Sequence, residues 1–132
     1  MSRIADTTVL IDLWRLRREP QRLADLRSKL VAPCLPLPVL FEFARGAAFR
    51  GVARDKLDQF LNGFDFLVPS YDEVVRAANL DAALRKSGQE IGGSDVWIAA
   101  AALERDLPVL TANIDHFTRI EGLKVIGYRI LP

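Results

Sequence analysis

The chain has 132 residues, 50% hydrophobic and 27% charged, which excludes a disordered polymer and suits one domain, expected over residues 1–132. A single cysteine excludes an internal disulfide framework and a Cys-rich zinc site, and no apolar run approaches the roughly 20 residues of a bilayer span. The net charge of +1 excludes a global basic field, and because acids interrupt any secretory-signal pattern we expect a cytoplasmic protein with no membrane partner.

Hydrophobic periodicity, prolines and glycines divide the first half of the chain into alternating strands and helices. Pro38 suits the first turn of a helix, where its missing N–H would have no partner. Cys34 lies in an apolar stretch and is interpreted as a small buried side chain. The predicted elements are a strand at Arg3–Ala5, helices over 8–16 and 21–30, a strand over 32–35, helices over 38–48 and 54–61, and a strand over 64–68.

The second half begins with a long amphipathic helix that is predicted to end at Lys86. Ser70 suits its N-cap, and Glu73, three residues later, completes the pattern of a capping box. Glycines at positions 88, 92 and 93 indicate a loop. An unbroken apolar run over 96–103 then predicts a helix over 95–105 that is buried nearly all round, followed by strands over 109–111 and 124–128.

This alternation of strands and helices predicts parallel strand pairing with right-handed crossovers. We therefore expect an α/β fold, a three-layer α/β/α sandwich around a central parallel sheet of four or five strands. Ligands of such sheets bind beyond the carboxyl ends of the strands. Polar side chains at those ends are the first candidates for a functional site.

Four acidic residues fall where a strand ends and a helix begins. Asp6 follows the first strand, Glu42 lies one turn into the helix after the second, Asp95 opens the buried helix, and Asp115 follows the strand over 109–111. Carboxylates about 4 Å apart repel by roughly 4 kcal/mol per pair at an effective dielectric near 20, so a cluster must take up a proton or hold a cation. Hard oxygen ligands favour Mg²⁺ or Mn²⁺, which can activate water for phosphodiester hydrolysis.

Each acid also has a structural explanation. Asp6 suits a helix N-cap, and Asp95 gains from the helix dipole, with the serine before it available as the cap. Glu42 is flanked by large hydrophobic side chains, so it needs a partner, which is either a metal ion or the nearby Arg45. Asp12 lies too far along the first helix to share an ion with Asp6 and is interpreted as part of the scaffold.

Basic side chains gather in the two helices that follow the first strand. They are candidate RNA-binding residues because Lys and Arg contact phosphates, although a solvated helix face explains the same cluster. Trp14 and Trp97 stand in apolar helical contexts, which favours packing over base stacking. The candidate RNA-binding residues are Arg15, Arg17, Arg18 and Arg22.

Several segments together resemble a known family. In chain order they are residues 6–12 (DTTVLID), 38–46 (PVLFEFARG), 94–100 (SDVWIAA), 109–117 (VLTANIDHF) and 120–125 (IEGLKV). Their order and spacing resemble the PIN-domain nucleases, specifically the VapC-type toxins of bacterial and archaeal toxin–antitoxin pairs. The resemblance spans the whole chain.

The resemblance implies a Mg²⁺-dependent endoribonuclease, with Mn²⁺ as an alternative ion, that cuts a structured RNA such as tRNA or ribosomal RNA. It implies a homodimer that is neutralised by a small antitoxin protein, whose tail enters the acidic site. Asp6, Glu42 and Asp95 would be catalytic, metal-binding acids. The supporting residues would be Thr8, Thr111 and Asn113.

The last motif departs from the family pattern. The family usually places a fourth acid immediately before the phenylalanine, where this chain has His116, its only histidine, and Asp115 comes one residue earlier. A one-residue offset near a helix start turns a side chain by roughly 100°. Asp115 would therefore have to shift into the catalytic, metal-binding role, or His116 would contact the metal, a water or the phosphate. His116 also suits an ordinary surface position.

Other functional classes remain as alternatives. A degenerate PIN module would bind RNA or protein without cleaving it. A phosphatase of the haloacid-dehalogenase type needs a second acid two residues after the first, where this chain has Thr8. A receiver-like module needs paired acids at the first strand and a lysine after the last, and the sequence has neither.

Overall fold

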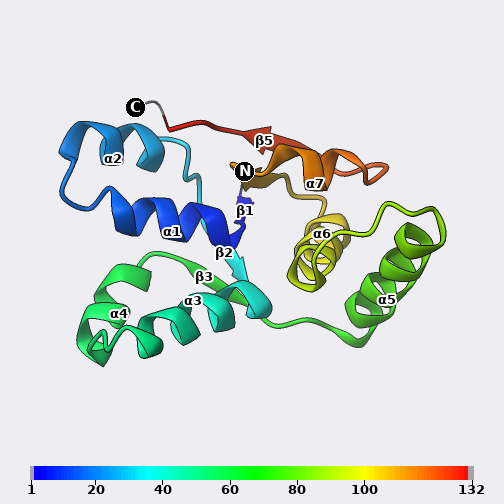
Figure 1. The fold of residues 1–132 in the computed structure, drawn as a ribbon, viewed down its shortest axis with the longest axis horizontal. Helices are drawn as coiled ribbons and strands as arrows, with labels where there is room; N and C mark the ends of the chain where they lie inside the picture. Colours follow the sequence, from blue (N-terminus) through cyan, green and yellow to red (C-terminus); the bar gives the residue numbers. More distant parts are fainter. Residues whose placement is uncertain (1, 131–132) are drawn as a thin grey trace.

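The computed structural model describes residues 2–130, which form a five-stranded sheet (Figure 1). Every strand pairing is parallel, and the strand order is β3-β2-β1-β4-β5. The strands are β1 (Arg3–Ala5), β2 (Pro33–Pro36), β3 (Asp65–Leu67), β4 (Val109–Thr111) and β5 (Val125–Gly127). The predicted parallel sheet is therefore confirmed, and its strands are short.

Helices cover the sheet on both sides, which confirms the three-layer α/β/α architecture. Figure 1 shows α1 to α4 on one side of the sheet and α5 and α6 on the other, with α6 packed on β1, β2 and β4. No helix within residues 2–130 is long and apolar enough to cross a membrane. The helices are α1 (Thr7–Arg15), α2 (Pro20–Arg27), α3 (Leu37–Phe49), α4 (Arg54–Leu61), α5 (Tyr71–Lys86), α6 (Gly93–Arg105) and α7 (Ile114–Thr118).

Helix α6 is the central helix of the core. Its four consecutive alanines, residues 99–102, are at most 1% exposed, because side chains this small let the helix lie close against the sheet. Trp97 and Leu103 are half-buried and pack against the same core. The prediction of a helix buried nearly all round is confirmed.

The aromatic side chains of the helical layer pack against one another. Trp14 lies edge-on to Phe60, with ring centroids 5.4 Å apart, and Phe60 stacks on Phe43 at 5.0 Å. These contacts confirm that Trp14 is a packing residue. Cys34 is buried and free, also as expected.

Two local predictions are corrected. Ser70 caps α5 by accepting the Glu73 N–H, but the Glu73 carboxylate does not close a capping box. It pairs instead with Arg105 of α6, because Glu73 is only 3% exposed and a buried acid needs a charged partner. A helix start is expected near Asp115, but the sequence predicts no range for the short helix α7, because at five residues it is too short to show a periodicity.

The strand order reverses between β1 and β4. The connections from β1 to β3 run in one direction along the sheet, and the connection from β3 to β4 returns past β1 to its other side. In open parallel sheets, a crevice forms at the carboxyl ends of the strands where the order switches. The fold therefore places the last residues of β1 and β4, and the helix starts that follow them, at one crevice.

Candidate active site at the carboxyl edge of the sheet

Asp6 is the buried centre of this edge. It follows β1 directly and caps α1, and its Oδ1 accepts the Val9 N–H at 3.3 Å and the Thr8 hydroxyl at 2.5 Å. The other oxygen, Oδ2, accepts the hydroxyl of Thr111, the last residue of β4, also at 2.5 Å. The Asp6 carboxylate is thus the predicted cap of the helix as well as the predicted site residue, and Asp6 is 3% exposed.

Burial raises the pKa of Asp6 above its ordinary value. The hydrogen bonds from Thr111, Thr8 and the Val9 amide lower that pKa without cancelling the cost of desolvation, and the negative charge of Asp95 raises it further. Ionised Asp6 is therefore held in place by donors but lacks a countercharge. A bound cation would supply one.

Glu42 lies on α3 and reaches the same crevice. Its Oε1 accepts the hydroxyl of Ser94 on α6, and burial is the main cause that raises its pKa. The charge of Arg45 lowers this pKa and the charges of Asp95 and Asp6 raise it. Arg45 itself lies 5.4 Å over the Phe41 ring, and its influence on Glu42 is through its charge.

The structure thus assigns Ser94 a different position from the predicted one. The N-cap of α6 is Gly92, which makes no side-chain cap, and Ser94 lies in the first turn with its hydroxyl turned to Glu42. Sequence reasoning missed this contact because it joins residues 52 positions apart. The only signal of this contact in the sequence was a polar residue, Ser94, next to an acid, Asp95, at the start of a helix.

Asp95, in the first turn of α6, is bonded to His116 on α7. His116 Nδ1 lies 2.8 Å from Asp95 Oδ2 and 2.9 Å from the side-chain nitrogen of Asn113. Because an ionised carboxylate only accepts, the Nδ1 proton donates to Asp95 in this arrangement, so the Asn113 amide nitrogen, itself a donor, makes no hydrogen bond to Nδ1 in that tautomer. Asp95 is also the acid whose charge raises the pKa of both Asp6 and Glu42, so all three acids face one another across the crevice.

Asp115 lies apart from this group. It is exposed in the first turn of α7, and none of its side-chain contacts within the described chain reaches Asp6, Glu42 or Asp95. The structure therefore shows a direct contact to the acids for His116, whereas the role of Asp115 stays a prediction. The turn of direction expected from a one-residue offset accounts for this difference.

The donor set fits a hard divalent ion. In the part of the chain from residue 2 to 130, no three His, Cys, Asp or Glu side chains already form a group that could hold a metal ion, and each of the three acids is bonded to a polar neighbour. Burial and mutual repulsion nevertheless raise the pKa of Asp6 and Glu42, and a cation relieves both. The Thr7 hydroxyl is buried without a hydrogen bond of good geometry, although it lowers the pKa of Glu42 slightly.

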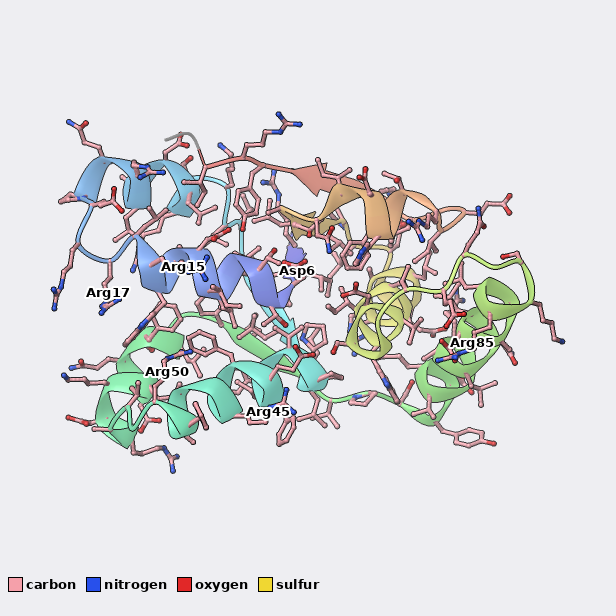
Figure 2. All side chains as sticks on the ribbon, in the orientation of Figure 1. Asp6, Arg15, Arg17, Arg45, Arg50 and Arg85 are labelled. Atoms are coloured by element: carbon pink, nitrogen blue, oxygen red, sulfur yellow. The ribbon has the colours of Figure 1, made fainter. Side chains whose placement is uncertain are left out.

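Two other groups of predicted residues lie outside the crevice. Asp12 accepts the Tyr128 hydroxyl at 2.7 Å, and burial raises the pKa of Tyr128 strongly, which agrees with a scaffold role for Asp12. The arginines lie at the other end of α1 from Asp6, as Figure 2 shows for Arg17. Of the predicted RNA-binding residues, Arg15, Arg17 and Arg18 are exposed, whereas Arg22 on α2 is half-buried and pairs with Glu19 at 2.8 Å.

Known proteins are similar to this chain over nearly its whole length. A model of the PIN domain family matches residues 3–123. Ribonuclease VapC1 of Methanocaldococcus jannaschii is 30% identical over 128 residues, which cover 92% of this chain and 85% of that protein. Ribonuclease VapC1 of Haemophilus influenzae strain R2866 is 25% identical over 123 residues, 90% of this chain and 92% of that protein.

Solved structures share the fold over nearly the whole chain. VapBC-1 from nontypeable Haemophilus influenzae aligns with a TM-score of 0.79 and 25% identity, covering 96% of this chain and 98% of that one. VapBC2 from Rickettsia felis, bound to a DNA fragment from its promoter, aligns with a TM-score of 0.82 over 98% of this chain and 100% of that one. At 22% identity, the second match supports the fold alone.

Proposed function

This chain belongs to the PIN-domain family as a relative of the VapC ribonucleases, and from this premise we propose that it is an endoribonuclease. The enzyme would use Mg²⁺, or Mn²⁺ in its place, to hydrolyse phosphodiester bonds of a structured RNA of the tRNA or rRNA class. The observation that carries the proposal is the buried Asp6 carboxylate at the β1–β4 switch point, held by two hydroxyls and facing two further acids.

Asp6, Glu42 and Asp95 would hold the ion. When bound, a divalent ion supplies an activated water and stabilises the charge that develops on the phosphate. Thr8 and Thr111 fix the orientation of the Asp6 carboxylate, because each of its oxygens accepts a different hydroxyl. These hydroxyls also favour the ionised form of Asp6, which is the form that binds a cation.

The other two acids each have a positioning residue. The Ser94 hydroxyl holds Glu42, and His116 holds Asp95, while Asn113 contacts the same ring nitrogen of His116. His116 therefore acts in our proposal through Asp95, and it takes the position where the family usually has a fourth acid. Asp115 is left out of the proposed machinery because its side chain is exposed and no hydrogen bond or ion pair within residues 2–130 links it to the three acids.

An antitoxin protein is the proposed partner, since the solved relatives are VapBC toxin–antitoxin assemblies. A second copy of the chain is the other. Large apolar side chains stand exposed along the edge strand β3 and the segments beside it, and such edges are normally covered. The exposed residues are Leu37, Phe41, Phe66, Val68 and Tyr71.

Light scattering on a size-exclusion column tests the homodimer. We expect the wild type to elute as a dimer, and the Val68→Asp/Tyr71→Glu variant as a folded monomer, because both side chains are at least 75% exposed and fill no core position. A variant that stays dimeric would contradict this interface. A monomeric wild type would contradict the homodimer itself.

The nuclease proposal is tested by incubating unfractionated tRNA and rRNA with the protein, with Mg²⁺ and with chelator. We expect discrete internal fragments only with the metal, and none from Asp6→Asn. Asp12→Asn is the matched control: it makes the same charge change farther along the same helix, and the amide oxygen can still accept the Tyr128 hydroxyl. Equal cleavage by wild type and Asp6→Asn would refute the mechanism.

A module that binds RNA without cutting is the second candidate, because the acids are not already grouped around an ion position and a histidine replaces the fourth acid. RNA binding by the wild type without metal-dependent cleavage would favour it.

A further inference from the structure

A hollow of about 670 Å³ lies at the end of α1 remote from Asp6. Its lining comes from three places in the chain, the end of α1 with the turn after it, the turn between α3 and α4, and α4 itself. Four cationic side chains line it and no acid does: Arg17, Arg18, Arg50 and Lys56. Figure 2 shows Arg17 and Arg50 on the same side of the molecule, away from Asp6.

The cations are available to a ligand. All four side chains are exposed, and within residues 2–130 no ion pair with an acid engages any of them. Arg17 lies 4.4 Å over the Trp14 ring and donates to the Trp14 carbonyl at 2.8 Å. Because Trp14 is itself fixed against Phe60, the Arg17 guanidinium is held in place before any ligand arrives.

We propose that this hollow is a subsite for the backbone phosphates of the RNA substrate, several nucleotides from the bond that is cut. The inference rests on the proposed nuclease function. Four cations gathered without an acid repel one another, and a polyanion relieves that repulsion. Arginine and lysine are also the side chains that bind phosphate groups.

The position of the hollow favours RNA over an acidic protein segment. Helix α1 has nine residues, which corresponds to about 14 Å between the Asp6 end and the hollow at 1.5 Å per residue. A stacked strand rising about 3.4 Å per nucleotide spans that length in about four nucleotides. A strand cut beside Asp6 therefore passes the hollow if it follows α1.

The charge of the site strengthens the argument. The crevice carries three acids, which repel phosphate, and the net charge of +1 gives no general attraction for RNA. Affinity for a polyanion must then come from a local cationic surface. The hollow is such a surface. Arg50 and Lys56 lie at least 33 positions from Arg17 in the chain, so the sequence alone did not connect these residues.

The test is the salt dependence of binding to labelled bulk tRNA without divalent ions, so that no cleavage occurs. The Arg50→Gln/Lys56→Gln variant removes two phosphate contacts. The slope of log affinity against log salt should fall by about 1.4 to 1.8, at 0.7 to 0.9 per contact. If the affinities converge near 1 M salt, this slope change corresponds to about 25- to 60-fold weaker binding near 0.1 M.

Arg85→Gln/Lys86→Gln is the matched control. It removes the same net charge from the end of α5, and Figure 2 places Arg85 on the other side of the molecule. We expect this control to keep the wild-type slope. An unchanged slope in Arg50→Gln/Lys56→Gln, or an equal change in both double variants, overturns the proposal.

Two further measurements separate the possible causes of failure. Labelled poly-glutamate serves as a probe of acidic protein: if the hollow variant loses poly-glutamate binding and keeps tRNA binding, the hollow is a protein site and the proposal is wrong. Wild-type cleavage of the same tRNA with Mg²⁺ is measured in parallel. Cleavage with an unchanged slope refutes the subsite alone, whereas a wild type that neither binds nor cuts RNA refutes the proposed function as well.

Discussion

The Thr111→Val substitution removes one donor from Asp6 and keeps the shape of the side chain. The Thr111 hydroxyl donates to Asp6 Oδ2 at 2.5 Å, and Thr111 is 0% exposed. A hydrogen bond to a charged group contributes about 1.5–3 kcal/mol. At 1.36 kcal/mol per pKa unit, its loss should raise the pKa of Asp6 by about 1–2 further units.

The sign of the pH effect follows from burial. Burial raises the pKa of folded Asp6 above its ordinary value, so between those two values the folded protein holds a proton that the unfolded chain has released. In that pH interval the free energy of unfolding falls as pH rises. The valine variant extends the interval upward. Because a metal ion needs the ionised carboxylate, the midpoint of pH-dependent Mg²⁺ binding should move up by about 1–2 units.

Calorimetric titration with Mg²⁺ over a pH series measures this midpoint. Thr111→Ser is the matched control, because it keeps the hydroxyl that donates to Asp6 and accepts the Asn113 N–H. We expect the serine variant to bind like the wild type. A valine variant with an unshifted midpoint, or a serine variant shifted as far as valine, would refute the assignment of this hydroxyl.

Two further predictions concern other contacts. His116→Ala should weaken divalent-ion binding by about 10- to 100-fold, because Asp95 loses its positioning partner, whereas Asp115→Asn should leave binding unchanged; calorimetry that finds equal losses would contradict this. Arg105→Met leaves Glu73 buried without its ion-pair partner and should lower the free energy of unfolding by about 3–5 kcal/mol in urea titrations. A loss below about 1 kcal/mol would mean that the pair behaves as an exposed one.

The parts of the fold that the sequence predicted are those with strong local signals. The bounds of β1, β4 and α4 match the prediction, because short apolar runs in the strands, helical spacing of apolar residues in α4 and the flanking turns determine them nearby in the chain. Other ends differ by a few residues, since helix ends depend on capping contacts. Glu73 illustrates the limit: its spacing from Ser70 fits a capping box, but α6 packs against α5 and offers Arg105, a stronger partner for a buried acid.

The site shows the same division between local and long-range causes. Asp6 and Glu42 could be selected as candidates because they follow strands at the edge where parallel α/β sheets bind ligands, and Asp95 because it lies at the start of the buried helix. The partners that hold them could not, since Thr111 lies 105 positions from Asp6 and Ser94 lies 52 from Glu42. The choice between Asp115 and His116 likewise depends on how α7 is rotated, which no neighbouring residue determines.

The grouping of three acids around one divalent ion is tested most directly by anomalous diffraction from crystals soaked in Mn²⁺. We expect one principal peak, bound by the carboxylates of Asp6, Glu42 and Asp95, with His116 still bonded to Asp95. This requires Glu42 to leave the Ser94 hydroxyl or to share it with the ion. A principal peak elsewhere in the molecule, or no peak near Asp6 at Mn²⁺ concentrations that support cleavage, would contradict the proposed metal site.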